Sequence, residues 1–235
     1  MKKLAICISG SLRSLEICNE NFIKNIFIPN KQNYDITLFL YLPNDINSAK
    51  ISLLSELNPI YTINDDVVLK EPNLIWRGRP ISTYVDNVSQ GGIQGYLQQL
   101  YGIEKSFELM VKYEKEHHIK FDFILRCRSD VIYKTPINID QYNLNKIILP
   151  KFHSYRGVND RFAVGNREIM VIYMKMYSYI YTLSNEYISK DKKLNIFQAE
   201  FFCKLNLDIH EIDYQITNTI LFNRVRMGNK ISNDC

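Results

Sequence analysis

Nearly continuous apolar runs alternate with stretches of helical spacing along the first part of the chain. Residues 3–8 and 35–42 are predominantly apolar and predict buried strands of the kind found in parallel sheets. A Ser-Gly-Ser turn at 9–11 ends the first run, and apolar residues at helical spacing follow it. Further patterns predict a helix over 48–57 and a strand over 59–63. This alternation predicts an α/β protein with a mostly parallel central sheet flanked by helices.

The longest predicted helix covers 93–116, where apolar residues recur at helical spacing. A second stripe at the same spacing is polar and consists of Gln94, Gln98, Tyr101 and Lys105. Such a stripe faces either solvent or a cleft. The preceding segment, 70–91, is irregular and carries Trp76, Arg77 and Arg79. A loop of this length either closes over a ligand or lies on the surface.

The pattern then returns to shorter elements. We expect strands over 121–130 and 147–152, helices over 167–183 and 197–205, and one or two strands within 209–222. No internal repeat or linker emerges. The whole chain, 1–235, is therefore expected to form a single domain.

Composition narrows the function classes. The chain has 235 residues, of which 46% are hydrophobic and 23% charged, as in soluble globular proteins. A net charge of +4 fits an anionic small substrate but lacks the dense basic patch of a nucleic-acid binder. We therefore expect no nucleic-acid partner.

The five cysteines (7, 18, 127, 203 and 235) show no paired spacing, so we expect reduced thiols, with neither a disulfide framework nor a zinc site. No signal peptide and no apolar run of about 18 residues occurs, so no membrane span is expected. These features favour a cytoplasmic location. The abundance of Lys, Asn and Ile indicates an AT-rich genome, viral or bacterial, and hence the host cytoplasm if the source is viral.

The strand predicted over 121–130 ends in charged residues that an ordinary core strand does not need. A period of two places Phe121, Phe123, Leu125 and Cys127 on one side, and Arg126, Arg128 and Asp130 on the other, about 6–7 Å apart. Such a charged row suits a diphosphate, which arginines bind, together with Mg²⁺ or Mn²⁺, which a carboxylate binds. The alternative is a buried ion pair that ties two strands together.

Four segments in order along the chain resemble the nucleotide-sugar glycosyltransferases of the GT-A fold. They are Ser9–Arg13, Gln98–Gly102, Phe121–Asp130 and Asn159–Gly165. The sequence is most similar to the small enzymes of large DNA viruses and of bacterial surface-glycan clusters. The resemblance implies a single GT-A domain that moves a sugar from a nucleoside-diphosphate sugar to a hydroxyl of a glycan or glycoprotein.

In that family an Asp-x-Asp motif at a strand end binds Mn²⁺ or Mg²⁺, which holds the donor diphosphate. Here the matching triplet is Arg128-Ser129-Asp130, with arginine in the first position. Either Asp130 alone is the protein's metal ligand, or Arg128 partly replaces the ion. The residues expected to bind the donor are Ser9, Gly10, Arg13, Gln98, Arg126 and Arg128.

Asp160 is the first candidate for the catalytic base, since an inverting transferase needs a carboxylate to take the acceptor's proton. In a retaining enzyme it would instead bind sugar hydroxyls, and it could also be a turn or cap residue. Glu200 is the reserve candidate, with an exposed helical glutamate as the alternative. His210 is either a late metal or phosphate contact or a structural residue.

Two other functions remain open. A sugar nucleotidyltransferase also needs arginines and a metal-binding carboxylate, but it usually has a longer glycine-rich loop than the one at 9–11. A non-catalytic, transferase-like binding module in a glycan-assembly complex would explain the altered metal motif.

Overall fold

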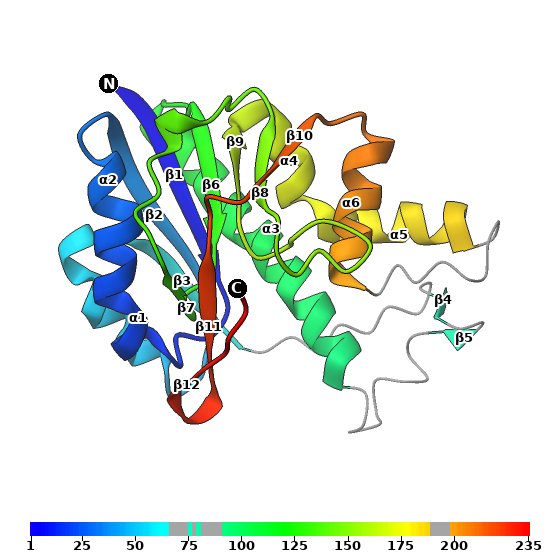
Figure 1. The fold of residues 1–235 in the computed structure, drawn as a ribbon, viewed down its shortest axis with the longest axis horizontal. Helices are drawn as coiled ribbons and strands as arrows, with labels where there is room; N and C mark the ends of the chain where they lie inside the picture. Colours follow the sequence, from blue (N-terminus) through cyan, green and yellow to red (C-terminus); the bar gives the residue numbers. More distant parts are fainter. Residues whose placement is uncertain (66–74, 77–78, 81–90, 189–197) are drawn as a thin grey trace.

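A seven-stranded sheet forms the centre of the molecule, in the strand order β10-β8-β9-β6-β1-β2-β3. The computed structural model describes all residues except 66–74, 77–78, 81–90 and 189–197 (Figure 1). The strands of the sheet are β1 (Lys2–Ser9), β2 (Tyr34–Pro43), β3 (Ile60–Asn64), β6 (Phe123–Cys127), β8 (Ile147–Pro150), β9 (Ala163–Asn166) and β10 (Tyr214–Thr217). Only β9 runs antiparallel to its neighbours, so the expected mostly parallel sheet is confirmed.

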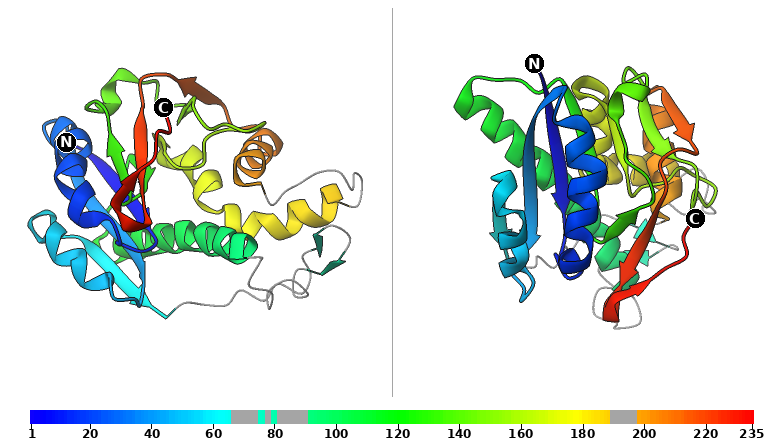
Figure 2. Two further views of the ribbon diagram at one scale, coloured as in Figure 1. Left: turned by 60° about the horizontal axis from the view of Figure 1, so that its bottom comes forward. Right: turned by 60° about the vertical axis from the view of Figure 1, so that its left-hand side comes forward.

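Helices cover both faces of this sheet (Figures 1 and 2). They are α1 (Leu15–Phe22), the π-helical η1 (Ile23–Phe27), α2 (Ile28–Asn30), the 3₁₀ helix η2 (Ser48–Leu57), α3 (Gly91–His117), α4 (Arg167–Met174), α5 (Met176–Ile188) and α6 (Ala199–Ile209). Short 3₁₀ turns, η5 and η6, cover Ile139–Gln141 and Met227–Asn229. Among the described residues, none of the helices has the length and apolar character needed to cross a membrane.

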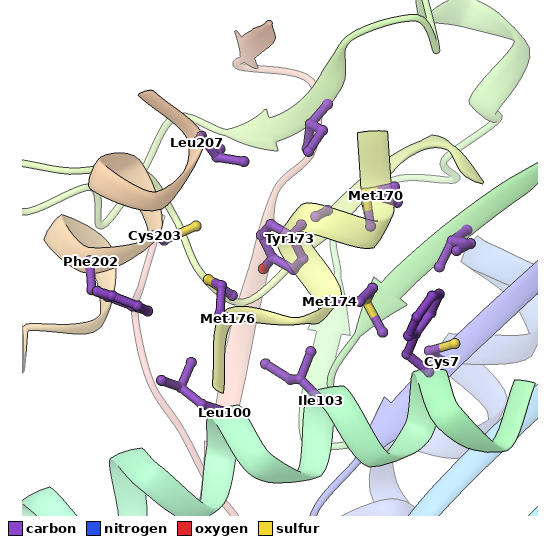
Figure 3. Packing of buried hydrophobic residues seen from close by; sticks show 14 of the residues in the cluster. Cys7, Leu100, Ile103, Met170, Tyr173, Met174, Met176, Phe202, Cys203 and Leu207 are labelled. Atoms are coloured by element: carbon purple, nitrogen blue, oxygen red, sulfur yellow. The ribbon is translucent and has the colours of Figure 1, made fainter. Parts of the chain in front are cut away.

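Two hydrophobic cores form because successive side chains of β1 point to opposite faces of the sheet. Leu4, Ile6 and Ile8 join the core beneath α1 and η1. Ala5 and Cys7 join the core formed with α3, α4, α5 and α6, where Tyr173 is fully buried (Figure 3). The central strands are therefore covered on both sides, which explains why β1 and β2 are apolar along most of their length.

A smaller antiparallel sheet follows the arginine-rich strand, in the order β12-β11-β7. Its strands are β7 (Val131–Tyr133), β11 (Phe222–Arg226) and β12 (Lys230–Ile231). Arg224 donates three hydrogen bonds to Asp234, one from its backbone N–H and two from its guanidinium, all at 2.8 Å, which fix the C-terminal segment against β11. Two further strands, β4 (Ile75–Trp76) and β5 (Arg79–Pro80), form a two-stranded antiparallel sheet.

The predicted strand over 121–130 is too long. β6 ends at Cys127, and Arg128 to Asp130 lie in a bend after it. Phe121 precedes the strand and packs in the α3 core, opposite to the side predicted, because a period of two holds only within the strand itself.

Two further differences concern the second half of the chain. The helix expected over 167–183 is interrupted at Lys175, which separates α4 from α5. Strand β9 was not predicted, because it is short and almost wholly buried between β6 and β8 and so shows no alternating pattern.

Candidate functional site

A cavity of about 420 Å³ opens at the carboxyl ends of the parallel strands. Ser9 ends β1 and Gly10 follows it, Tyr41 and Pro43 lie at the end of β2, Asn64 ends β3, and Arg128 follows β6, while α3 closes the cavity from the side. The lining residues are Ser9, Gly10, Ser11, Arg13, Tyr41, Pro43, Asp45, Asn64, Asp65, Gly95, Gln98, Gln99, Tyr101, Gly102, Arg126, Arg128, Ser129 and Asp130. Open α/β sheets bind ligands in this position, outside the carboxyl ends of the strands.

Glycine residues shape the entrance between β1 and α3. Gly10 has φ of +103°, a backbone conformation that residues with a Cβ strongly disfavour. Its N–H donates to the carbonyl of Tyr41 at 3.0 Å. A Cβ on Gly102 would lie only 3.2 Å from the Cβ of Ser9. The missing side chain therefore lets α3 approach the end of β1.

Arginines gather at the β6 end of the cavity. Arg128 donates from Nε to Asp130 Oδ1 at 2.7 Å and from Nη2 to Oδ2 at 2.8 Å. Arg13 Nη2 lies 3.4 Å from the same Oδ2. Arg126 is 2% exposed, and its Nη1 donates to the carbonyl of Asp160. Rather than standing apart along a strand, Arg128 and Asp130 therefore form a two-pronged ion pair.

Asp130 is held in its ionised form by these neighbours. Burial by itself would raise the pKa of its carboxyl group, since a charge loses hydration in the interior. The charge and hydrogen bonds of Arg128, with a contribution from Arg13, outweigh this effect and lower the pKa to about 2. The same pairing outweighs burial at Arg128 and raises the pKa of its guanidinium.

Carboxylates and tyrosines occupy the β2–β3 end of the cavity. Asp45 accepts a hydrogen bond from the backbone N–H of Asn47 at 2.8 Å. Burial raises the pKa of Asp45, but its hydrogen bonds with Ser11 and Asn47 outweigh burial and lower it. The rings of Tyr41 and Tyr101 meet edge to face with centroids 6.0 Å apart. The described lining thus has a cationic end and an end rich in hydrogen-bond acceptors and aromatic surface.

Gln99 links the arginine cluster to Asp160. Its Oε1 accepts from Arg128 Nη1 at 3.4 Å, and its Nε2 donates to Asp160 Oδ2 at 2.6 Å. Asp160 is 5% exposed and is not part of the cavity lining, so Gln99 lies between it and the cavity. The other oxygen of Asp160, Oδ1, is buried and has no hydrogen-bond partner among the described residues.

A second ion pair lies beside Asp160. Arg161 Nη2 donates to Glu200 Oε1 at 3.1 Å, and both side chains are largely buried. Burial, reinforced by the negative charge of Asp160, raises the pKa of Glu200. The expectation of an exposed helical glutamate is therefore wrong, because the loop before β9 folds over the start of α6.

The structure brings the predicted donor-binding residues together. Ser9, Gly10, Arg13, Gln98, Arg126 and Arg128 all line the cavity, as does Asp130. Whether they bind a nucleotide sugar remains a prediction. His210 lies elsewhere, at the end of α6, where its Nδ1 is 2.8 Å from the carbonyl oxygen of Asn206. Arg77 lies outside the described residues.

Several lining residues were not anticipated, among them Gln99, Asp45 and Asp65. Asp45 and Asp65 follow predicted strands, so the convergence of parallel strand ends at one edge would have identified them. No sequence pattern identifies Gln99, because its contacts with Arg128 and Asp160 depend on how other elements pack against α3.

Comparison with known proteins gives a family and two structural similarities. Residues 1–223 match the family described as Domain of unknown function (DUF7796). No curated protein matches the chain. Mouse xyloside xylosyltransferase 1 in its apo form is similar at 12% identity and a TM-score of 0.45, with 92% of this chain and 84% of that chain covered.

A glycosyltransferase involved in the glycosylation of the major capsid of PBCV-1 is similar at 10% identity and a TM-score of 0.43. The alignment covers 92% of this chain and 81% of that chain. Both solved structures are glycosyltransferases, the class that the sequence resembles. At this level of identity and superposition, the two similarities carry no argument about function.

Proposed function

The chain belongs to the DUF7796 family, and from the chemistry of its cavity we propose that it is a glycosyltransferase that uses a nucleoside-diphosphate sugar. One observation carries the proposal: a single cavity joins an arginine cluster to an end lined by carboxylates and tyrosines. Its volume lies within the range of small-molecule sites, about 300–1,000 Å³.

A nucleotide sugar fits this division of charge. Guanidinium groups match the geometry and charge of phosphate oxygens, so Arg13, Arg126 and Arg128 would hold the diphosphate. Asp45 and Asp65 would accept hydrogen bonds from ribose hydroxyls, and Tyr41 and Tyr101 offer aromatic surface to the base. Ser9, Gly10 and Gln98 line the space between the two ends.

The transfer itself forms one bond and breaks another. The oxygen of an acceptor hydroxyl bonds to the anomeric carbon, and the diphosphate leaves with the electron pair of the broken carbon–oxygen bond. The arginines stabilise the negative charge that develops on the leaving diphosphate. We assign the proton of the acceptor hydroxyl to Asp160, whose Oδ1 has no hydrogen-bond partner among the described residues and lies 4.0 Å from Arg161 Nε. Because Gln99 separates Asp160 from the cavity, this step requires the Gln99 side chain to turn aside when the acceptor binds.

A binding screen with the purified chain tests this proposal. Thermal unfolding is followed with UDP, GDP, CMP and dTDP, each with and without Mn²⁺, and the activated sugars of any nucleotide that binds are then assayed for nucleotide release. A ligand at a hundredfold excess over its dissociation constant stabilises the native state by about 2.7 kcal/mol, which gives a clear shift in Tm. Asp160→Asn should bind equally well but lose turnover by about a hundredfold or more.

The possible outcomes separate the alternatives. Binding followed by sugar-dependent release supports a transferase. Nucleotide binding without nucleotide release from any activated sugar supports the non-catalytic binding module. In that case Asp160→Asn would change no measured property of the site. The transferase proposal is wrong if no nucleotide binds and none is released.

A further inference from the structure

The cationic end of the cavity already carries the charge that a diphosphate requires. Its described side chains are three arginines, Arg13, Arg126 and Arg128, and one carboxylate, Asp130. Three positive charges and one negative charge leave a formal charge of +2. A nucleotide-sugar diphosphate has one negative charge on each of its two phosphates, so the two charges balance without an added ion. This step rests on the proposed function.

The residues do not fit a resident divalent cation. Both oxygens of Asp130 accept hydrogen bonds from Arg128, and Arg13 approaches one of them. Mg²⁺ and Mn²⁺ are bound through such carboxylate oxygens, so an ion here would have to displace the guanidinium. Over the described part of the chain, no three His, Cys, Asp or Glu side chains are grouped so as to hold a metal.

Arg128 is also well placed to act on a phosphate. Nε and Nη2 are directed at Asp130, and Nη1 faces Gln99. A guanidinium has five N–H groups, so each terminal nitrogen keeps one hydrogen beyond these contacts. Arg128 therefore has its orientation fixed by Asp130 and Gln99 while it retains donors for a ligand in the cavity.

Arg13 supplies a second positive charge that is held less tightly than that of Arg128. Its side chain is 40% exposed and, among the described residues, contacts Asp130 at 3.4 Å, a long hydrogen bond. Little is lost if Arg13 turns from Asp130 to a phosphate oxygen. A buried, oriented arginine and an exposed, loosely held one can thus contact the diphosphate from two sides.

We propose that Arg128 and Arg13 take the place of a divalent cation, so that this site binds a nucleoside diphosphate, and neutralises it as it leaves, without a metal ion. Asp130 then acts as the residue that orients Arg128, and not as a metal ligand. Arg128 stands where the Asp-x-Asp motif has its first carboxylate, so that a guanidinium replaces the charge that a metal ion would supply.

The test is isothermal titration of the full-length chain with UDP, GDP and dTDP, each in EDTA and in excess Mn²⁺. We expect at least one of them to bind in EDTA, with a dissociation constant that Mn²⁺ changes by less than about threefold. A threefold change corresponds to only about 0.7 kcal/mol of binding free energy. Arg13→Ala should weaken binding in EDTA by about tenfold or more, the worth of a charged hydrogen bond. Lys112→Ala, which removes a 71% exposed charge on α3, is the matched control and should leave binding unchanged.

Arg128→Asp provides the converse experiment, because it places two carboxylates around Ser129. This variant should fail to bind in EDTA and regain binding with Mn²⁺. Arg128→Lys keeps the charge but loses the two-pronged contact, and should bind more weakly in both conditions. If Arg128→Asp does not fold, the wild-type comparison and Arg13→Ala decide the question.

The outcomes also distinguish this inference from the proposed function. Wild-type binding that requires Mn²⁺ and is lost in Asp130→Ala overturns the metal-free site and leaves the transferase proposal standing. Absence of binding in both conditions overturns the two together.

Discussion

Asp130 acquires its properties both from a bend in its own segment and from a residue distant in sequence. A row of charges was expected along one face of a strand, yet the bend after β6 turns Arg128 back onto Asp130, and Arg13 arrives from the segment after β1. Gln99 escaped prediction for the same reason. One glutamine in a polar helical stripe gives no sign that it will contact both Arg128 and Asp160.

The pairing of Asp130 makes stability depend on pH in the acid range. Because the folded pKa of about 2 lies below the unfolded value near 3.9, the pair stabilises the fold fully above about pH 5. This contribution, about 2 kcal/mol, should fall by about half at pH 3 and continue to fall as the pH passes through the folded pKa. Urea denaturation of wild type and Asp130→Asn between pH 3 and 7 measures it. A difference between the two proteins that does not change with pH would contradict the assignment.

Among the elements, the loop before β9 and the start of α6 depend on each other. Val158 N–H donates to the carbonyl of Glu200 at 3.0 Å, and a Cβ on Gly157 would lie 1.8 Å from that same carbonyl oxygen. The glycine therefore permits the close approach that places Arg161 against Glu200. The sequence predicted a polar stretch here but gave no partner for it.

Gly157→Ala should force this loop away from α6. We expect a loss of about 2 kcal/mol or more in the free energy of unfolding, as for other overpacked positions. Gly95→Ala is the matched control, since a Cβ there meets nothing within 4 Å and alanine favours the helix by about 0.5–1 kcal/mol. Urea denaturation of both variants provides the comparison, and equal stabilities would refute the proposed clash.

At the scale of the whole molecule, the two cores share the same central strands. Alternate residues of β1 enter the core under α1 and the core under α3, so neither core can form without the strand that serves the other. The small sheet is tied in as well, because Val225 N–H donates to the carbonyl of Asp130 at 2.8 Å.

This sharing predicts that the chain unfolds in one cooperative transition, as a single domain does. Calorimetry should give equal calorimetric and van't Hoff enthalpies, and far-ultraviolet circular dichroism should coincide with the near-ultraviolet signal of the buried tyrosines, such as Tyr173. Two separated transitions would show that the chain comprises two independently folding units.

The sequence by itself determined the class of fold and seven of the residues that line the cavity. Local patterns predict the main elements: the apolar runs at residues 3–8 and 35–42 predict strands, and the helical spacing over 93–116 predicts a helix. These patterns are visible in the sequence because an element that is buried on one or both faces needs apolar residues at regular positions. Because parallel strands end at one edge, the polar residues that follow them converge there. Only the tertiary structure decided which of these side chains pair: that Arg13 approaches Asp130, that Gln99 reaches Asp160, and that Glu200 is buried against Arg161. These contacts join residues 39, 61 and 117 positions apart, and no local pattern specifies a partner that the folding of other elements must bring into place.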